Sequence, residues 1–177
     1  PLAMSSAASD VYKRQACSTM TIGTEYGNLV GATVEILGNL DLSSTVGTIY
    51  LNGVNSLANI KVSTDSGDIK GSAVVSNFVT VTSNSGNLNI IELFLGIALK
   101  ELAPPNQGAP GINTKLTSGD ITLEGLQGLM NPSDASNLNV NLQTGGAGNV
   151  KLIINGNGFL GEYDISSLNG KEGVLIE

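Results

Sequence analysis

The stretch KVSTDSGDIKG (Lys61–Gly71) recurs in related forms along this chain, and the repeat predicts the fold. Apolar and polar side chains alternate on both sides of Gly67, which is the period-two pattern of β-strands. Similar stretches are VTVTSNSGNLNI (Val79–Ile90) and TKLTSGDITLEG (Thr114–Gly125). The predicted unit is therefore a strand, a glycine corner and a second strand.

Five glycines align when the units are superimposed, with spacings of 20, 20, 19 and 33 residues: Gly27, Gly47, Gly67, Gly86 and Gly119. A tight corner favours glycine because a positive φ brings it no steric cost. Weaker copies of the unit surround the Gly145–Gly148 cluster and Gly170. The sequence therefore predicts about seven units of about 20 residues, with Gly170 as the sixth assigned corner glycine.

The residue after each of the five aligned glycines is small and polar: Asn28, Thr48, Asp68, Asn87 and Asp120. Stacked units would bring these side chains into one ladder along the corner, where amides can bond to the units above and below. A row of cation or sugar ligands is the functional alternative, and corner chemistry is the favoured interpretation.

The fold class follows from the inability of one such unit to bury its apolar face alone. Stacked units share a continuous core, so we expect an all-β chain that forms a single β-solenoid, a right-handed parallel β-helix. Two insertions interrupt the period, near 92–111 and 125–137. In the first, LFLGIALKEL (93–102) precedes Pro104-Pro105 and predicts one short helix.

Residues 1–15 differ from the rest, since they have no strand pattern and hold the only arginine, Arg14. The run SAASDVYKRQ resembles a translated sequencing adaptor, so we expect a non-native, disordered tail before a solenoid domain at 16–177. The native N-terminus, with any leader or membrane anchor, would then be missing.

Composition excludes several functions. The 177 residues carry a net charge of −7, which argues against nucleic-acid binding because that affinity comes from Lys and Arg. No histidine occurs anywhere and no arginine after residue 15, so the usual acid–base and uronate-binding groups are missing. Paired carboxylates could still hydrolyse a glycoside, with Asp41, Asp65 and Asp68 as candidates on neighbouring units. We predict no catalytic residue, cofactor or metal site.

The repeats resemble those of the putative adhesin domains of unknown function, which carry T-x-S-G-D-I motifs in bacterial and fungal proteins. The resemblance covers roughly Ala16–Glu177 and rests on KVSTDSGDIKG, VTVTSNSGNLNI and TKLTSGDITLEG. It implies a β-solenoid at the cell surface or outside the cell, and it supplies no catalytic or ligand residues.

Three functions remain open from the sequence. The first is a non-enzymatic, adhesin-like module that binds a surface glycan or protein. The second is a polysaccharide-active β-helix enzyme, a glycoside hydrolase or lyase. The third is a stalk or sensor domain of an envelope protein whose anchor lies outside this sequence. Because the strand pattern continues to Glu177, we also expect an open edge that can pair with another copy.

Overall fold

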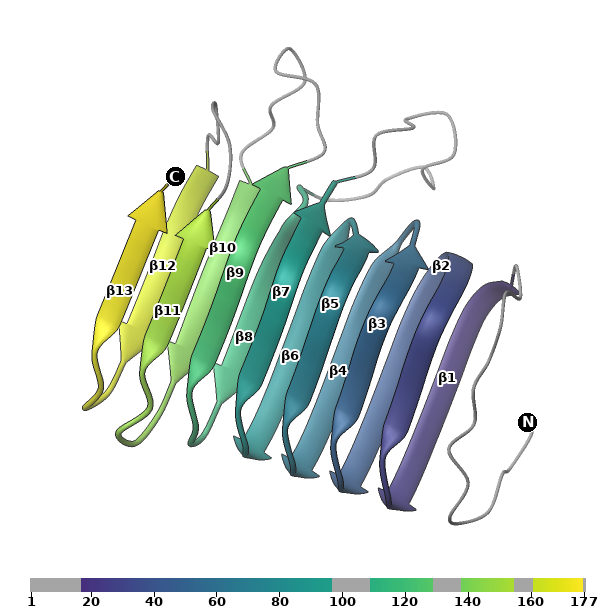
Figure 1. The fold of residues 1–177 in the computed structure, drawn as a ribbon, viewed down its shortest axis with the longest axis horizontal. Helices are drawn as coiled ribbons and strands as arrows, with labels where there is room; N and C mark the ends of the chain where they lie inside the picture. Colours follow the sequence, from purple (N-terminus) through teal and green to yellow (C-terminus); the bar gives the residue numbers. More distant parts are fainter. Residues whose placement is uncertain (1–16, 97–108, 129–137, 155–160, 177) are drawn as a thin grey trace.

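The structure is a computed structural model that describes residues 17–96, 109–128, 138–154 and 161–176. In this part of the chain it contains thirteen β-strands and no helix (Figure 1). The strands are β1 (Cys17–Tyr26), β2 (Leu29–Val46), β3 (Ile49–Ser56), β4 (Asn59–Ser66), β5 (Ile69–Ser76), β6 (Phe78–Ser85), β7 (Leu88–Leu95), β8 (Gly111–Leu116), β9 (Ile121–Gly128), β10 (Leu138–Thr144), β11 (Val150–Ile154), β12 (Gly161–Ser167) and β13 (Glu172–Ile176).

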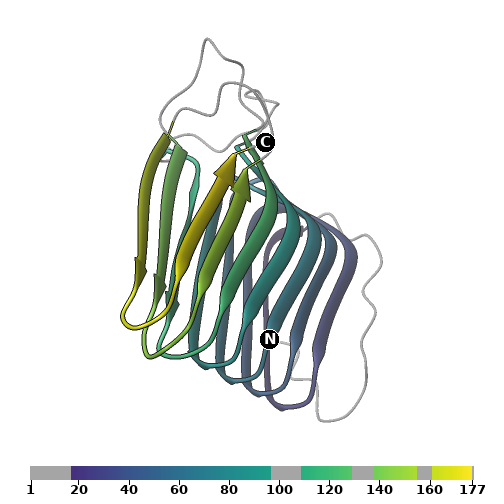
Figure 2. The same cartoon turned by 60° about the vertical axis from the view of Figure 1, so that its left-hand side comes forward.

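The strands form two parallel layers that face each other across the core (Figure 2). The first sheet contains β1, the second half of β2, and then β4, β6, β8, β10 and β12. The second sheet contains the first half of β2, and then β3, β5, β7, β9, β11 and β13. Strand β2 belongs to both sheets because its 18 residues continue through the corner between them.

The chain winds through seven coils, each with one strand in either sheet, as the repeat predicts. In Figure 1 the strands of the second sheet point upward in front, those of the first sheet point downward behind, and the chain advances from right to left. The winding is therefore right-handed. The predicted all-β parallel solenoid is confirmed, including the two coils that the sequence places only weakly.

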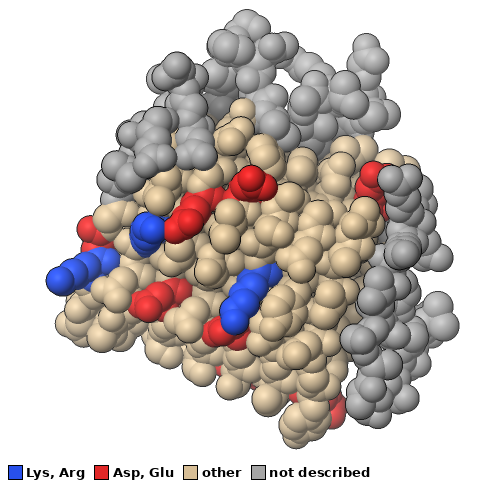
Figure 3. Space-filling model, viewed as in Figure 1, with Lys and Arg blue, Asp and Glu red and all other residues tan. Residues whose placement is uncertain are grey.

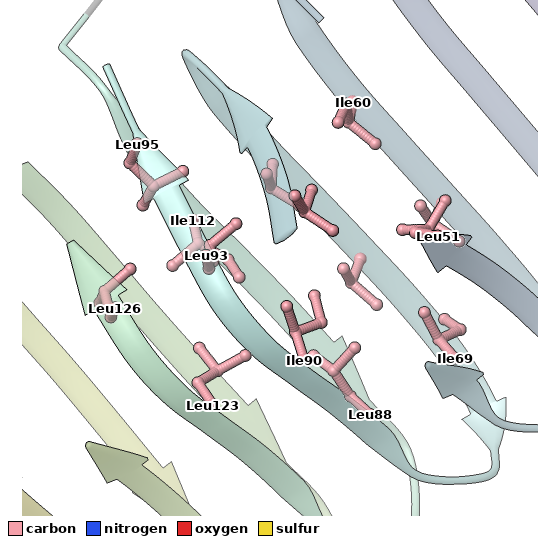
Figure 4. Packing of buried hydrophobic residues seen from close by; sticks show 14 of the residues in the cluster. Leu51, Ile60, Ile69, Leu88, Ile90, Leu93, Leu95, Ile112, Leu123 and Leu126 are labelled. Carbon is pink, nitrogen blue, oxygen red and sulfur yellow. The ribbon is translucent and has the colours of Figure 1, made fainter. Parts of the chain in front are cut away.

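The core is a stack of aliphatic side chains that come from equivalent positions of successive coils (Figure 4). On the first sheet, Leu40, Ile60, Val79, Ile112 and Val140 are buried in register. On the second sheet, Ile49, Ile69, Leu88 and Ile121 do the same. Full burial of each such side chain contributes about 1.5–3 kcal/mol.

The second sheet also contains a column of residues with positive φ that the sequence does not reveal. They are Thr33 (52°), Gly53 (63°), Ala73 (51°), Glu92 (62°) and Gly125 (68°). Each lies between two inward positions that are three residues apart, such as Leu51 and Val54, instead of the usual two. At Thr33 and Ala73 the first of these positions is a glycine, Gly31 or Gly71. The extra residue bends the second-sheet strand at the same level in each of the first five coils and keeps the following apolar side chain inside.

The predicted helix is wrong at its start, because Leu93–Leu95 belong to β7. Leu93 and Leu95 are fully buried, and this strand register extends the core instead of leaving the solenoid. The remaining helix residues, 97–102, lie outside the described residues, as do residues 1–16. The second insertion also begins later than expected, since β9 continues to Gly128.

Candidate functional site

The predicted corner ladder forms along the edge where the first sheet turns into the second. The Thr48 N–H donates to Asn28 Oδ1 at 2.9 Å, and the Asp120 N–H donates to Asn87 Oδ1 at 2.9 Å. Asp68 Oδ1 accepts bonds from the Asn87 N–H at 3.0 Å and from Asn87 Nδ2 at 3.2 Å. Each of these side chains thus binds the backbone of the next coil.

Two further coils continue this ladder in a way that the sequence misses. Asp120 Oδ1 accepts the Asn149 N–H at 2.7 Å, and Asn149 Oδ1 accepts the Lys171 N–H at 3.1 Å. The Gly145–Gly148 cluster contains several glycines, so the sequence alone does not show which one forms the corner. In the structure it is Gly148, which stacks on Gly119. An Asn after the last glycine of the cluster is the signal that locates it.

Close backbone approach is the second reason for the glycine column. A Cβ on Gly67 would overlap the carbonyl oxygen of Gly47 in the preceding coil, and the same contact recurs at every later corner. Gly27 in the first coil has no such neighbour. Gly27, Gly47, Gly67, Gly86 and Gly119 also have positive φ, whereas Gly170 does not. At Gly170 the backbone approach alone excludes a side chain.

The corner ladder binds largely to itself, as the interpretation of corner chemistry expects. The oxygens of Asn28, Asp68, Asn87, Asp120 and Asn149 face backbone N–H groups of the next coil. The N–H of Asn87 lowers the pKa of Asp68, burial opposes this shift, and Lys70 at 3.3 Å adds to it. Within the described residues, no group of three or more His, Cys, Asp or Glu side chains could hold a metal ion. The ladder is a structural seam between coils.

A polar groove of about 470 Å³ lies on the outer face of the first sheet, beside this corner. Its lining comes from strands of five neighbouring coils and their corners: Thr24, Ser43, Ser44, Thr45, Ser63, Thr64, Asp65, Thr82, Ser83, Asn84, Lys115 and Thr117. One wall contains Ser43, Ser63, Thr82 and Lys115, which are direct partners in adjacent strands. The other wall contains Thr45, Asp65, Asn84 and Thr117, so the groove runs across the strands.

Hydrogen bonds fix part of the second wall and leave most of the first wall free. Asn84 Nδ2 donates to Asp65 Oδ1 at 3.0 Å, and Ser118 Oγ donates to the Asn84 carbonyl at 3.2 Å. The hydroxyls of Ser43, Ser63 and Thr82 make no hydrogen bond within the described part of the chain. These hydroxyls can therefore donate to, and accept from, a bound molecule.

Between the walls, the groove floor consists of Ser44, Thr64 and Ser83, whose side chains turn inward and are buried. Among the described residues, their hydroxyl oxygens have no hydrogen-bond partner. In two later coils the inward hydroxyl does have an acceptor. Thr144 Oγ1 donates to the Gly119 carbonyl at 2.7 Å, and Ser167 Oγ donates to the Gly148 carbonyl at 2.5 Å. The floor hydroxyls lie inside the solenoid and do not line the open groove.

The three candidate carboxylates have separate surroundings. Asp41 pairs with Lys61 at 3.9 Å, Asp68 belongs to the corner ladder, and Asp65 alone lines the groove. A glycosidase needs two carboxyl groups on opposite sides of one bond. Among the described residues, the groove offers one carboxylate and one ammonium group, that of Lys115.

The outer face of the second sheet is different in character. Figure 3 shows this face with few charged side chains, several of them in pairs of opposite sign. Two pairs are Lys70 with Asp68 at 3.3 Å and Lys151 with Glu124 at 2.6 Å.

A scan against protein-family models found no match, and searches of curated proteins and of solved structures found none either. A search of the described residues for a helix long and apolar enough to span a membrane also found none.

Proposed function

We propose that this protein is a non-enzymatic, adhesin-like binding module of the cell surface or the extracellular space, which presents the outer face of its first sheet to a partner. The observation that carries the proposal is the groove with hydroxyls that are free to bind. Its chemistry suits recognition, since hydroxyl, amide, carboxylate and ammonium groups all lie within one concave surface.

The rigidity of the support favours binding through this surface. The groove walls project from parallel strands whose backbone groups are paired on both sides in the interior coils. Binding groups held on such strands need little ordering when a partner arrives, and this preserves affinity. A stalk or sensor domain would not need a concave polar surface of this kind.

The alternative of a polysaccharide-active enzyme would require a second acid close to Asp65. Asp65 is the one carboxylate in the lining, and the proposal of a binding module needs no other. The two functions therefore call for an experiment that registers binding and turnover together.

The experiment is to screen the protein against arrays of glycans, cell-wall fractions and extracellular matrix proteins while assaying the same glycans for sugar release. We expect saturable binding to at least one ligand without release. Sugar release that disappears in Asp65→Asn, with no binding elsewhere, would overturn the proposal and favour the hydrolase. As a control, Asp41→Asn removes a carboxylate that lies on the same face but outside the groove.

A further inference from the structure

We infer that the groove on the first sheet binds a neutral, hydroxyl-rich glycan chain that lies along the solenoid axis, across successive coils. This inference rests on the proposed binding function and names the ligand class. Four observations carry it: the direction of the groove, its unpaired hydroxyls, its balance of charge and its saturated backbone.

The direction comes from strand register. Ser43, Ser63 and Thr82 are direct partners on three neighbouring strands, so their side chains follow one another along the axis at about 4.7–4.9 Å. The opposite wall, with Thr45, Asp65 and Asn84, lies two residues further along the strands, about 6.6 Å away. A ligand that contacts both walls over several coils is therefore a linear chain.

The hydroxyls define what that chain must offer. Each serine or threonine hydroxyl carries one donor hydrogen and two acceptor lone pairs. Those of Ser43, Ser63 and Thr82 have no partner within the described residues, so each can both donate a hydrogen bond to a ligand and accept one from it. The hydroxyl groups of a glycan also donate and accept, and they recur with each sugar unit.

Charge excludes the acidic and basic alternatives. The lining contains one carboxylate, Asp65, and one ammonium group, Lys115. A chain of uronates would require several cationic groups, preferably arginines that bind in a bidentate manner. A polycation would require several acids. The charges of Asp65 and Lys115 add to zero, so the groove matches a neutral chain. Such a chain brings no charge of its own that the groove would have to pair.

The saturated backbone argues against a peptide strand. An extended peptide adds to a sheet at an edge, where N–H and C=O groups are free. Strands β4, β6 and β8 are paired with neighbours on both sides, so the face above them offers side chains alone. A ligand that satisfies side-chain hydroxyls without needing backbone partners fits this face.

Thr82→Val tests the contact, because it replaces the hydroxyl with a methyl group and keeps a β-branched side chain on strand β6. Thr80→Val is the matched control, since Thr80 lies on the same strand and the same face but outside the groove lining. The probes are cellohexaose and mannohexaose as neutral chains, with the disaccharides cellobiose and mannobiose, and hexagalacturonate as the acidic chain. Binding is measured by calorimetry with the full chain.

We expect at least one neutral hexasaccharide to bind at least tenfold more tightly than its disaccharide and than hexagalacturonate. Thr82→Val should weaken that binding at least fivefold, while Thr80→Val leaves it within twofold. Equal effects of the two variants, or preference for the acidic chain, would overturn the inference. If no neutral chain binds but the array screen finds a protein ligand, this inference fails and the proposed binding function stands. If neither binds and sugar is released, both fail.

Discussion

At the residue scale, the corner glycines combine two demands that a sequence does not separate. Positive φ applies from the first coil onward, whereas close approach begins with the second coil, because each Cα then rests on the carbonyl of the preceding glycine. The two demands can be measured separately, since Gly27 experiences only the first and Gly67 experiences both.

We expect Gly67→Ala to lower the free energy of unfolding by more than 3 kcal/mol and Gly27→Ala by about 1–2 kcal/mol. Both alanines adopt an unfavourable φ, but only the one at 67 displaces the backbone of a neighbouring coil. Urea denaturation followed by circular dichroism provides the values. Equal losses in the two variants would show that stacking at the corner is loose.

The buried hydroxyl row offers a second matched pair. The Thr64 hydroxyl is buried and has no partner among the described residues, whereas the Thr144 hydroxyl, further along the same row of the first sheet, donates to the Gly119 carbonyl. We expect Thr64→Val to raise the free energy of unfolding by about 1 kcal/mol and Thr144→Val to lower it by a similar amount. Thermal and urea unfolding check both. A loss in Thr64→Val as large as in Thr144→Val would contradict the assignment.

Asp68 makes the corner sensitive to acid. Its pKa is lowered chiefly by the N–H of Asn87, so between the folded and unfolded pKa values the unfolded chain binds more protons. Its contribution to stability is therefore complete above the unfolded pKa of about 4 and is lost as the pH falls through the lower folded value.

Asp68→Asn should retain an acceptor oxygen for the next coil and remove this pH dependence. We expect the urea midpoint of the variant to fall less than that of the native chain between pH 5 and pH 2.5. Asp41→Asn serves as the control, because Asp41 makes a surface ion pair outside the ladder. An unchanged pH profile in Asp68→Asn would show that other carboxylates dominate acid unfolding.

At the element scale, each strand of the second sheet in the first five coils is two short segments joined by one left-handed residue. Thr33, Ala73 and Glu92 hold this conformation without being glycine, which costs about 1–3 kcal/mol each. The coils bear this cost because the bend returns Val34, Val74 and Leu93 to the core.

Ala73→Gly should relieve that strain and raise the free energy of unfolding by about 0.5–1 kcal/mol, because glycine adopts a positive φ freely. Ala32→Gly is the control: Ala32 is also half-buried in the second sheet but has an ordinary strand conformation. There we expect a loss of about 1 kcal/mol. Differential scanning calorimetry of the two variants should therefore show shifts of opposite sign.

The sequence predicted what period-two alternation and the corner glycines encode: the strand pairs, the seven coils and the inward positions. Of the five expected ladder residues, Asn28, Asp68, Asn87 and Asp120 bond to the next coil, whereas the Thr48 side chain makes no such bond among the described residues. It could not predict the left-handed column, because Thr33, Ala73 and Glu92 share no property that marks a bend. The corner at Gly148 was ambiguous because neighbouring glycines satisfy the same pattern. The groove could not be predicted either, because it depends on how the strands curve in space and the spacing of residues in the sequence does not show this.

At the scale of the whole molecule, a solenoid is stabilised by contacts between neighbouring coils. Interior coils bury their aliphatic side chains almost completely, as at Ile60, Val79 and Ile112. In the first coil, Met20, Ile22 and Leu29 are only partly buried, as is Ile165 in the last. Stability should therefore fall toward both ends of the described solenoid.

Native-state hydrogen exchange should reveal this gradient. We expect the slowest exchange in β4–β9 and exchange at least tenfold faster in β1, β12 and β13, because opening a terminal coil breaks contacts on one side only. Exchange at one uniform rate in all strands would show that the seven coils open as a single cooperative unit.

The two corners of each coil differ in how much chain they can accept. At the corner ladder, the connection varies only from two residues, as at 67–68 between β4 and β5, to five residues, 145–149 between β10 and β11. At the opposite corner, the connection after β5 is one residue, Asn77, whereas β7 and β8 are separated by 15 residues, 96–110. Peptide epitopes grafted between β3 and β4 or between β5 and β6 would thus be displayed at that edge without disturbing the seam, at a pitch set by the coil spacing.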